Sequence, residues 1–352
     1  MKRMAKLKQF LGAGYRLICG GEPGLLRKRV FHAQRMIAER RILDEAGSGA
    51  AHFTPNRCPA CGGNGVSGRF TNPVGFSFAV CDSDGTVYME PVLSPSALNV
   101  LYNDESYTSF WSIVRFSATD DVARIRRFSG NGPRKSLLDV GCATGELLKL
   151  IQDCFVCSGV EINSGTAELA RQAGFDVTTG TLDDIVGDER FDVITMLQVI
   201  EHITEPRAIL ERAFKLLKPG GLLYLDTPCI DSASFALFRS RHVHVSGFGH
   251  VSLFTMQSLT HLADRCGYKT LEHSYTGGPD LQLCDLIGRK LAPSRYNHRT
   301  AFYSPRFFNG CELLDMATLG MLKKSMLPSG NESYQWATLQ RPLVAAGNPP
   351  PR

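Results

Sequence analysis

The stretch LLDVGCATGELL, residues 137–148, decides the fold of this chain. Its apolar start passes through Asp139 into a turn that begins at Gly141, and a second glycine, Gly145, follows four positions later. The leucines after Gly145 are typical of a helix. The stretch therefore predicts a buried strand, a glycine turn and a helix, which is the unit that opens α/β folds with a ligand at the turn.

The order of strand, turn and helix repeats along the chain from Lys135 onward. Strands are predicted at residues 136–142, 157–162, 176–182, 191–203 (running into a loop) and 221–228, and helices at 144–154, 164–174, 205–217 and 256–268. Such alternation brings parallel strands together with helices on both faces, so we predict an α/β, Rossmann-like fold. Ligands of these folds bind at the carboxyl ends of the strands.

The glycine turn at residues 141–146 is poorly suited to a phosphate. It lacks the Lys-Ser/Thr pair of a triphosphate site, and it has two glycines where a dinucleotide site uses three. Asp139 and Glu146 flank it with negative charge. A ligand with a cationic centre, such as an amino group and a sulfonium, fits better. Glu161 ends the next strand 20 residues after Gly141 and can accept hydrogen bonds from two ribose hydroxyls.

Five motifs occur in order with ordinary spacing, namely LLDVGCATGELL, GVEIN, GTLDDI, FDVITMLQVIEHITEP and LLKPGGLLYLDTP. Together they resemble a class I S-adenosylmethionine-dependent methyltransferase. The similar branch is the small-molecule one, which includes quinone O-methyltransferases and polysaccharide-cluster and deoxysugar methyltransferases. The likeness covers roughly residues 135–275. It implies a seven-stranded, mostly parallel sheet with an antiparallel last strand, for which residues 333–342 are the candidate.

The resemblance implies that S-adenosylmethionine binds along the strand ends. We expect its amino group near Asp139, its ribose at Glu161 and its adenine against Leu182, with Asp183 or a backbone amide at the exocyclic amine. Gln198 is expected beside the methionine part. The predicted cofactor-binding residues are Asp139, Gly141, Cys142, Ala143, Gly145, Glu161, Ile162, Leu182, Asp183 and Gln198.

Three residues near this edge are candidates for acid–base chemistry. Methyl transfer displaces sulfur from an activated carbon, so an enzyme mainly aligns the nucleophile and removes its proton. Glu201 and His202 follow the fourth strand, and His250 lies in FGHVSLFT, which resembles an element of the same branch. A purely structural role for each stays open. Some relatives bind a divalent metal here, but Gln198 stands where they have their first carboxylate, which weakens that interpretation.

The CPAC motif gives Cys58 and Cys61 the spacing of metal ligands. Relatives with an N-terminal zinc ribbon carry a second C-x-x-C pair followed by G-x-V-Y, and this chain has CDSDGTVY, with Cys81 and Asp84 in those places. Carboxylate oxygen can bind Zn²⁺, so these four residues are predicted to hold a structural zinc. A ribbon that has lost its metal and kept its shape is the alternative.

Charge and composition define the remaining parts of the 352-residue chain. Residues 1–50 hold 11 Lys/Arg and four Asp/Glu, whereas the net charge of the whole chain is +5. Only this basic helical arm is suited to a membrane surface or a polyanion. The alternative is a helix packed on the body. The other predicted parts are a ribbon-like module (51–95), a helical linker (96–134) and a methyltransferase domain (135–345) with a lid-like segment (229–255) and a helical cap (278–325).

The sequence favours a small-molecule methyl acceptor, such as a nucleotide- or lipid-linked sugar or a hydroxylated metabolite. An RNA- or protein-modifying methyltransferase that docks through the ribbon and the arm is the alternative. The ribbon offers only Arg57, Arg69 and Phe70 as a basic and aromatic face, so the nucleic-acid signal is not firm. Eleven scattered cysteines, with no signal peptide or apolar spanning run, predict a cytoplasmic protein.

Overall fold

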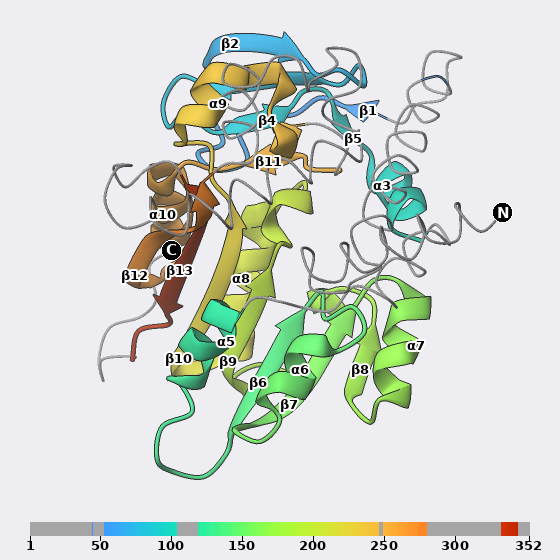
Figure 1. Ribbon diagram of the computed structural model, residues 1–352, viewed down its shortest axis with the longest axis vertical. Coiled ribbons are helices and arrows are strands. Elements are labelled where there is room, and N and C mark those ends of the chain that lie inside the picture. The colour runs from blue at the N-terminus through green and yellow to red at the C-terminus, as the bar shows by residue number, and fades with distance from the viewer. Residues whose placement is uncertain (1–43, 45–52, 104–118, 246–248, 280–331, 344–352) are drawn as a thin grey trace, which may run out of the picture.

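The computed structural model describes residues 44, 53–103, 119–245, 249–279 and 332–343. These residues form a large seven-stranded sheet and, above it in Figure 1, a small four-stranded sheet and a two-stranded one. The predicted arm (1–50) and cap (278–325) lie almost entirely outside the described residues, as does part of the predicted linker. Within the described ranges, no helix is long and apolar enough to cross a membrane.

The large sheet has seven strands in the order β12-β13-β10-β9-β6-β7-β8. Five of them are parallel: β6 (Lys135–Val140), β7 (Phe155–Glu161), β8 (Asp176–Thr179), β9 (Phe191–Leu197) and β10 (Leu217–Pro228). β13 (Glu332–Gln340) runs antiparallel between β10 and β12 (Lys269–Pro279). The predicted Rossmann-like sheet with one antiparallel strand is therefore confirmed. The last strand of the chain is inserted inside the sheet, where its buried residues Ala337 and Leu339 complete the core.

Helices cover both faces of the large sheet. One cluster of buried apolar residues packs with α5 (Thr119–Arg126), α6 (Glu146–Ile151) and α7 (Ser164–Gln172). A second cluster, on the other face, includes residues of α8 (Pro206–Leu216) and α10 (Met256–Arg265). Capping residues set where these helices begin. The side chains of Asn163 and Thr255 each accept an N–H group in the first turn of α7 and of α10, and Pro206 starts α8.

The small sheet has the order β11-β4-β3-β2, with β2 (Val66–Thr71), β3 (Ser77–Cys81), β4 (Val87–Met89) and β11 (Ser252–Leu253). β1 (Phe53–Thr54) and β5 (Val92–Leu93) pair beside it, and α3 (Pro95–Tyr102) follows. β11 comes from the segment predicted to be lid-like. The same segment contributes Ile230, Val251 and Leu253 to the apolar core under the small sheet, next to α9 (Ala233–Phe238). The described part of that segment is thus packed into the fold.

The small sheet stands over the carboxyl ends of the parallel strands (Figure 1). Two backbone hydrogen bonds connect the small sheet to this edge. The N–H of Met89 donates to the carbonyl of Val251 at 2.9 Å, and the N–H of Val251 donates to the carbonyl of Glu201 at 2.8 Å. Glu201 belongs to η2 (Ile200–His202), the short helix after β9. The edge where ligands of this fold bind therefore lies between the two sheets.

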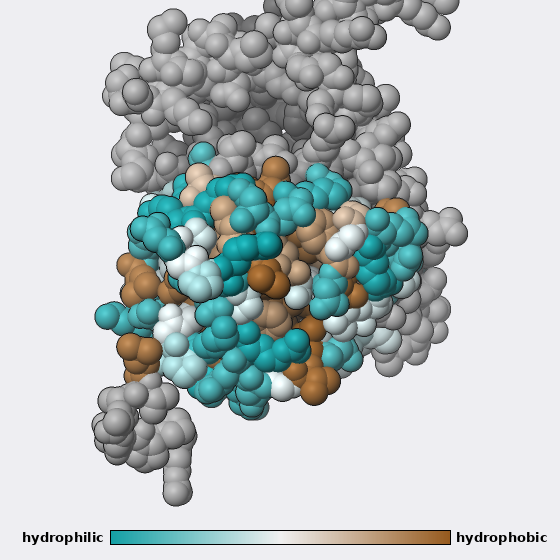
Figure 2. Space-filling model, turned by 90° about the horizontal axis from the view of Figure 1, so that it is seen from below, coloured by the Kyte–Doolittle hydropathy of each residue, from teal (hydrophilic) through white to brown (hydrophobic). Residues whose placement is uncertain are grey.

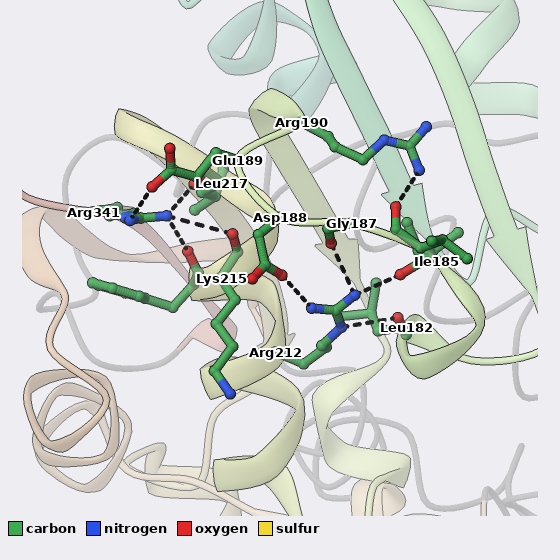
Figure 3. A network of polar contacts seen from close by, with 12 residues as sticks. Leu182, Ile185, Gly187, Asp188, Glu189, Arg190, Arg212, Lys215, Leu217 and Arg341 are labelled. Carbon is green, nitrogen blue, oxygen red and sulfur yellow. Dashed lines mark hydrogen bonds and ion pairs between the residues drawn. The ribbon is translucent and has the colours of Figure 1, made fainter.

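Two arginines bind the segments that connect η1, β9, α8 and β13 around the large sheet (Figure 3). Arg212 pairs with Asp188 at 2.8 Å and donates to the carbonyl groups of η1 (Leu182–Asp184) and of the loop that follows it. Arg341 pairs with Glu189 at 2.7 Å and donates to the carbonyl groups at the end of α8. Arg212 thus holds the segment between η1 and β9, and Arg341 ties the segment after β13 to the end of α8.

The face of the molecule seen from below is mainly hydrophilic, with separate hydrophobic patches (Figure 2).

Candidate active site and cysteine cluster

The glycine turn after β6 is left-handed at three positions. Gly141, Ala143 and Gly145 have φ angles of +71°, +45° and +78°. A side chain at Gly141 would place its Cβ 2.8 Å from Val199, and one at Gly145 would place its Cβ 3.0 Å from Phe175. The two glycines are therefore required by backbone conformation and close packing.

Glu161, at the end of β7, closes this turn. Its side chain is buried, and its two oxygens accept the N–H groups of Asn163 at 2.8 Å and Ala143 at 2.9 Å. Burial raises the pKa of this carboxyl. Each carboxylate oxygen keeps a further lone pair, so Glu161 can still accept ribose hydroxyls. Sequence reasoning missed its bond to Ala143, since nothing in the chain marks which amide a carboxylate will bind.

Asp139 lies at the end of β6 and is also buried. Thr195 Oγ1 donates to its carboxylate at 2.7 Å. Burial, with a smaller effect from the charge of Glu161, raises the pKa of Asp139 to about 7. A cationic ligand group beside it would offset the cost of keeping this carboxylate charged. Cys142 is buried and packs against β7, because a Cβ at Gly159 would lie 2.5 Å from its sulfur.

The expected adenine side is formed by the ends of β7 and β8. Leu182 is buried, Ile162 is 38% exposed and Asp183 is exposed, so an apolar surface lies beside an accessible carboxylate. Gln198, at the end of β9, has a φ angle of +58°, and its side-chain amide donates to Asp226.

Asp226 is a buried carboxyl that sequence reasoning did not single out. Burial, with contributions from neighbouring acids, raises the pKa of Asp226 well above its usual value. Its place in LYLDTP, where an apolar strand reaches the binding edge, was the available signal. Because Gln198 is bonded to Asp226, its amide is directed to the end of β10.

Glu201, His202 and His250 form a histidine cluster, with ligand atoms that lie within 4.8 Å of one another. Glu201 is fully buried. One of its oxygens accepts Thr227 Oγ1 at 2.9 Å, and the other, 4.0 Å from His202 Nε2, has no hydrogen-bond partner among the described residues. The rings of His202 and His250 are 4.7 Å apart. The structure thus brings the three predicted acid–base residues together.

The protonation of this cluster follows from its hydrogen bonds. His250 Nδ1 lies 2.7 Å from the carbonyl oxygen of His244, which can only accept, so the proton of a neutral ring sits on Nδ1. On such a ring the lone pair of His250 lies on Nε2. Burial raises the pKa of Glu201 to about 8, so this carboxyl is largely protonated near neutral pH. The cluster can receive a proton from a substrate, and its three donor atoms could also hold a cation.

The four predicted metal ligands form a cysteine cluster, also within 4.8 Å of one another. Cys58 Sγ lies 3.6 Å from both oxygens of Asp84, and Cys61 Sγ lies 3.6 Å from Cys81 Sγ. Zn–S bonds of about 2.3 Å in a tetrahedron separate two sulfurs by about 3.8 Å, so the spacing fits zinc. Thr255 Oγ1, at the start of α10, donates to the carbonyl of Asp84 at 3.1 Å and so links the cluster to a helix that covers the large sheet.

Replacing Asp139 by asparagine should stabilise the ligand-free protein, and the stabilisation should be larger at pH 8 than at pH 5. The raised pKa means that folding costs free energy as the pH rises from about 4 through about 7, and the asparagine escapes this cost. The increase in the free energy of unfolding is at most about 4 kcal/mol, because each pKa unit corresponds to about 1.4 kcal/mol. Urea unfolding at both pH values measures it.

The matched control is Asp192→Asn. Partial burial opposes the effect, but bonds from Lys218 and Ser136 lower the pKa of Asp192. Its loss should therefore destabilise the protein at pH 8. If Asp139→Asn changed the free energy of unfolding equally at the two pH values, the raised pKa of the buried Asp139 carboxyl would be contradicted.

The chain is similar in sequence to known methyltransferases over the part that forms this edge of the sheet. A methyltransferase domain family matches residues 111–273. The chain is 32% identical over 166 residues to the mitochondrial ubiquinone biosynthesis O-methyltransferase of Candida albicans, covering 42% of this chain and 51% of that protein. It is 37% identical over 109 residues to the ubiquinone biosynthesis O-methyltransferase of Cereibacter sphaeroides, covering 29% and 44%. The chain thus spans about half the length of the curated relatives it matches.

Among solved structures, phosphoethanolamine N-methyltransferase 2 of Haemonchus contortus in complex with S-adenosyl-L-methionine aligns with a TM-score of 0.48 and 16% identity, over 73% of this chain and 63% of that one. The family match covers the glycine turn, Glu161 and the histidine cluster. The sheet that carries them has the seven strands and the antiparallel β13 that the sequence motifs implied. The chain therefore contains a class I S-adenosylmethionine-dependent methyltransferase domain.

Proposed function

We propose that this protein transfers the methyl group of S-adenosylmethionine to a hydroxyl group of a small-molecule acceptor. The observation that carries the proposal is the histidine cluster, which lies at the same strand edge as Glu161 and the glycine turn. The relatives are named as O-methyltransferases, which supports a hydroxyl acceptor. A hydroxylated aromatic metabolite is the favoured class, and a nucleotide- or lipid-linked sugar is the alternative.

The donor, when bound, supplies a methyl group made electrophilic by its sulfonium. The chain's own residues then have three tasks. Glu161 holds the ribose, and Asp139 holds the positive end of the methionine part. His202 directs the acceptor hydroxyl and takes its proton on Nε2 as the oxygen forms its bond to the methyl carbon, which leaves S-adenosylhomocysteine and a methyl ether. Glu201 is buried with one carboxyl oxygen 4.0 Å from Nε2, and a negative charge on it would favour the imidazolium that proton transfer forms.

Replacing Glu161 should weaken cofactor binding, by an amount that depends on the residue that replaces it. Glu161→Ala removes the ribose acceptor and also releases Ala143 N–H, so we expect at least a hundredfold loss of affinity for S-adenosylhomocysteine. Glu161→Gln keeps one acceptor oxygen and should lose about tenfold. Isothermal titration calorimetry measures both. Glu168→Ala, an exposed glutamate on the neighbouring α7, is the control and should bind as the wild type does. Unchanged affinity in Glu161→Ala would contradict the proposal.

The acceptor class is tested by screening methyl transfer with labelled S-adenosylmethionine. We expect product from an ortho-diphenol such as 3,4-dihydroxybenzoate, and none from a UDP-hexose. His202→Gln should lower the turnover of the diphenol by at least a hundredfold and leave binding of S-adenosylhomocysteine unchanged, because His202 serves the acceptor. Product from the sugar alone would move the proposal to the alternative class.

We further propose that the cysteine cluster holds a structural zinc ion. The donor set supports it, since three thiols and one carboxylate supply four ligands and leave no open position. The small sheet is short, and a module of this size gains stability from a metal.

Metal analysis should find about one zinc per purified chain. Cys58→Ser should lose the metal and lower the melting temperature, whereas Asp84→Cys should keep it. Cys157→Ser, a cysteine on β7 outside the cluster, is the control that should retain zinc. Wild-type protein without zinc would end this proposal and leave the methyltransferase proposal intact.

A further inference from the structure

Gln198 lies beside the glycine turn that is proposed to hold the methyl donor. It follows β9, and β9 pairs in parallel with β6, with Met196 opposite Val140. The residues that come next, Gln198 and the turn that begins at Gly141, therefore lie at the ends of neighbouring strands. Close packing agrees with this, because a Cβ at Gly141 would lie 2.8 Å from Val199. The half-buried Gln198 side chain thus borders the proposed donor site.

Two hydrogen bonds fix Gln198 to a single residue of β10. Its backbone N–H donates to the carbonyl of Asp226 at 2.8 Å, and its side-chain Nε2 donates to the Asp226 carboxyl group. The backbone of Gln198 is left-handed, with a φ angle of +58°, which residues other than glycine rarely adopt. Such a conformation costs free energy, so the two bonds to Asp226 help to hold it.

The bond from Nε2 decides which atom of the Gln198 amide is left to accept from a ligand. With the nitrogen bound to Asp226, the oxygen Oε1 remains, and among the described residues no group donates to it. Burial raises the pKa of Asp226, but a protonated carboxyl still accepts through its unprotonated oxygen, so this orientation holds in both protonation states. Gln198 therefore offers an accepting oxygen at the strand edge.

The α-amino group of S-adenosylmethionine is the donor that suits this oxygen. It is an ammonium with three N–H groups, and a charged donor makes a stronger hydrogen bond than a neutral one. The carboxylate of the methionine part can only accept, so Oε1 would repel it. The bond proposed for Asp139 uses one of the three N–H groups and leaves two for other acceptors.

We propose that Asp226 is a positioning residue, which holds the Gln198 amide so that its oxygen receives the α-amino group of the methyl donor. The inference rests on the proposed placement of the donor along the strand ends. It assigns a task to a buried carboxyl that the methyl transfer does not otherwise use. Asp226 is 7% exposed, and among the described residues the only side chain that donates to it is Gln198.

The test is calorimetry with S-adenosylhomocysteine and two analogues. The deamino analogue carries hydrogen in place of the α-amino group, and the decarboxylated analogue keeps the amine and lacks the carboxylate. Asp226→Leu removes the acceptor of the Gln198 amide. We expect it to weaken binding of the two ligands that carry the amine by about fivefold, and to leave affinity for the deamino analogue within about twofold of the wild-type value.

Two further variants show whether Asp226 acts through Gln198. Gln198→Ala should lose about tenfold for the ligands with an amine, and the double variant with Asp226→Leu should lose no more than that. Asp226→Asn keeps a side-chain oxygen that can accept the amide, so it should bind S-adenosylhomocysteine within about twofold of the wild-type affinity. A loss in Asp226→Asn equal to that in Asp226→Leu would contradict the accepting role of Asp226.

The pattern across the three ligands separates the alternatives. If Asp226→Leu weakened the two ligands that carry the carboxylate and spared the decarboxylated analogue, the amide would be turned the other way and the inference would be overturned. An equal loss for all three ligands, or no loss for any, would also overturn it, because Asp226 would then have a structural role only.

Tyr224→Phe is the matched control on the same strand. The Tyr224 hydroxyl is buried and donates to Asp121 of α5. Its removal should lower the melting temperature and change the affinities for the three ligands equally or not at all. A loss confined to the ligands with an amine would overturn the inference, because the effect would then follow the packing of β10.

The wild-type titration distinguishes this inference from the proposed function. If wild-type protein did not bind S-adenosylhomocysteine, the proposed function would be overturned. If the wild type bound it and Asp226→Leu weakened the three ligands equally, only the role of Asp226 would be overturned.

Discussion

The site depends on one buried carboxylate. Glu161 accepts the N–H of Ala143 from the glycine turn and the N–H of Asn163 from the start of α7, and so it holds the ends of β6 and β7 in one geometry. Burying a carboxylate costs free energy, as its raised pKa shows, and the two amides offset only part of that cost. A hydroxyl-bearing ligand that adds further donors is therefore favoured at this position, and the free protein is already arranged for it.

The second constraint comes from the small sheet. β11 joins β4, and the neighbouring Val251 bonds to the backbone of Glu201, so the loop that bears His250 is held from both sheets. Without the small sheet, the segment around His250 would lose its pairing and part of its apolar core. The cysteine cluster includes Cys81 at the end of β3, and Thr255 links the cluster to α10, so the small sheet is also connected to α10. The packing of the small sheet therefore positions the segment that bears His250.

Much of this could be predicted from the sequence because the signals are local. The apolar strands, the glycine turn and the C-x-x-C spacing each depend on residues close together in the chain, and the seven-stranded sheet was implied by the family resemblance that the motifs carry. The pairing of β11 with β4, the place of β13 inside the sheet, and the bond between Gln198 and Asp226 could not be predicted. Gln198 and Asp226 are 28 positions apart, and only the pairing of β9 with β10 brings them together. Asp226 was missed because an acid at a strand end is a weak signal until burial is known.

The most direct test of the account is a crystal structure of the protein with S-adenosylhomocysteine. We predict that both ribose hydroxyls bind Glu161, that the amino group lies beside Asp139, and that the sulfur faces His202. A ligand bound away from the glycine turn, or a dinucleotide pyrophosphate found in its place, would contradict the central claim that this turn receives a sulfonium donor.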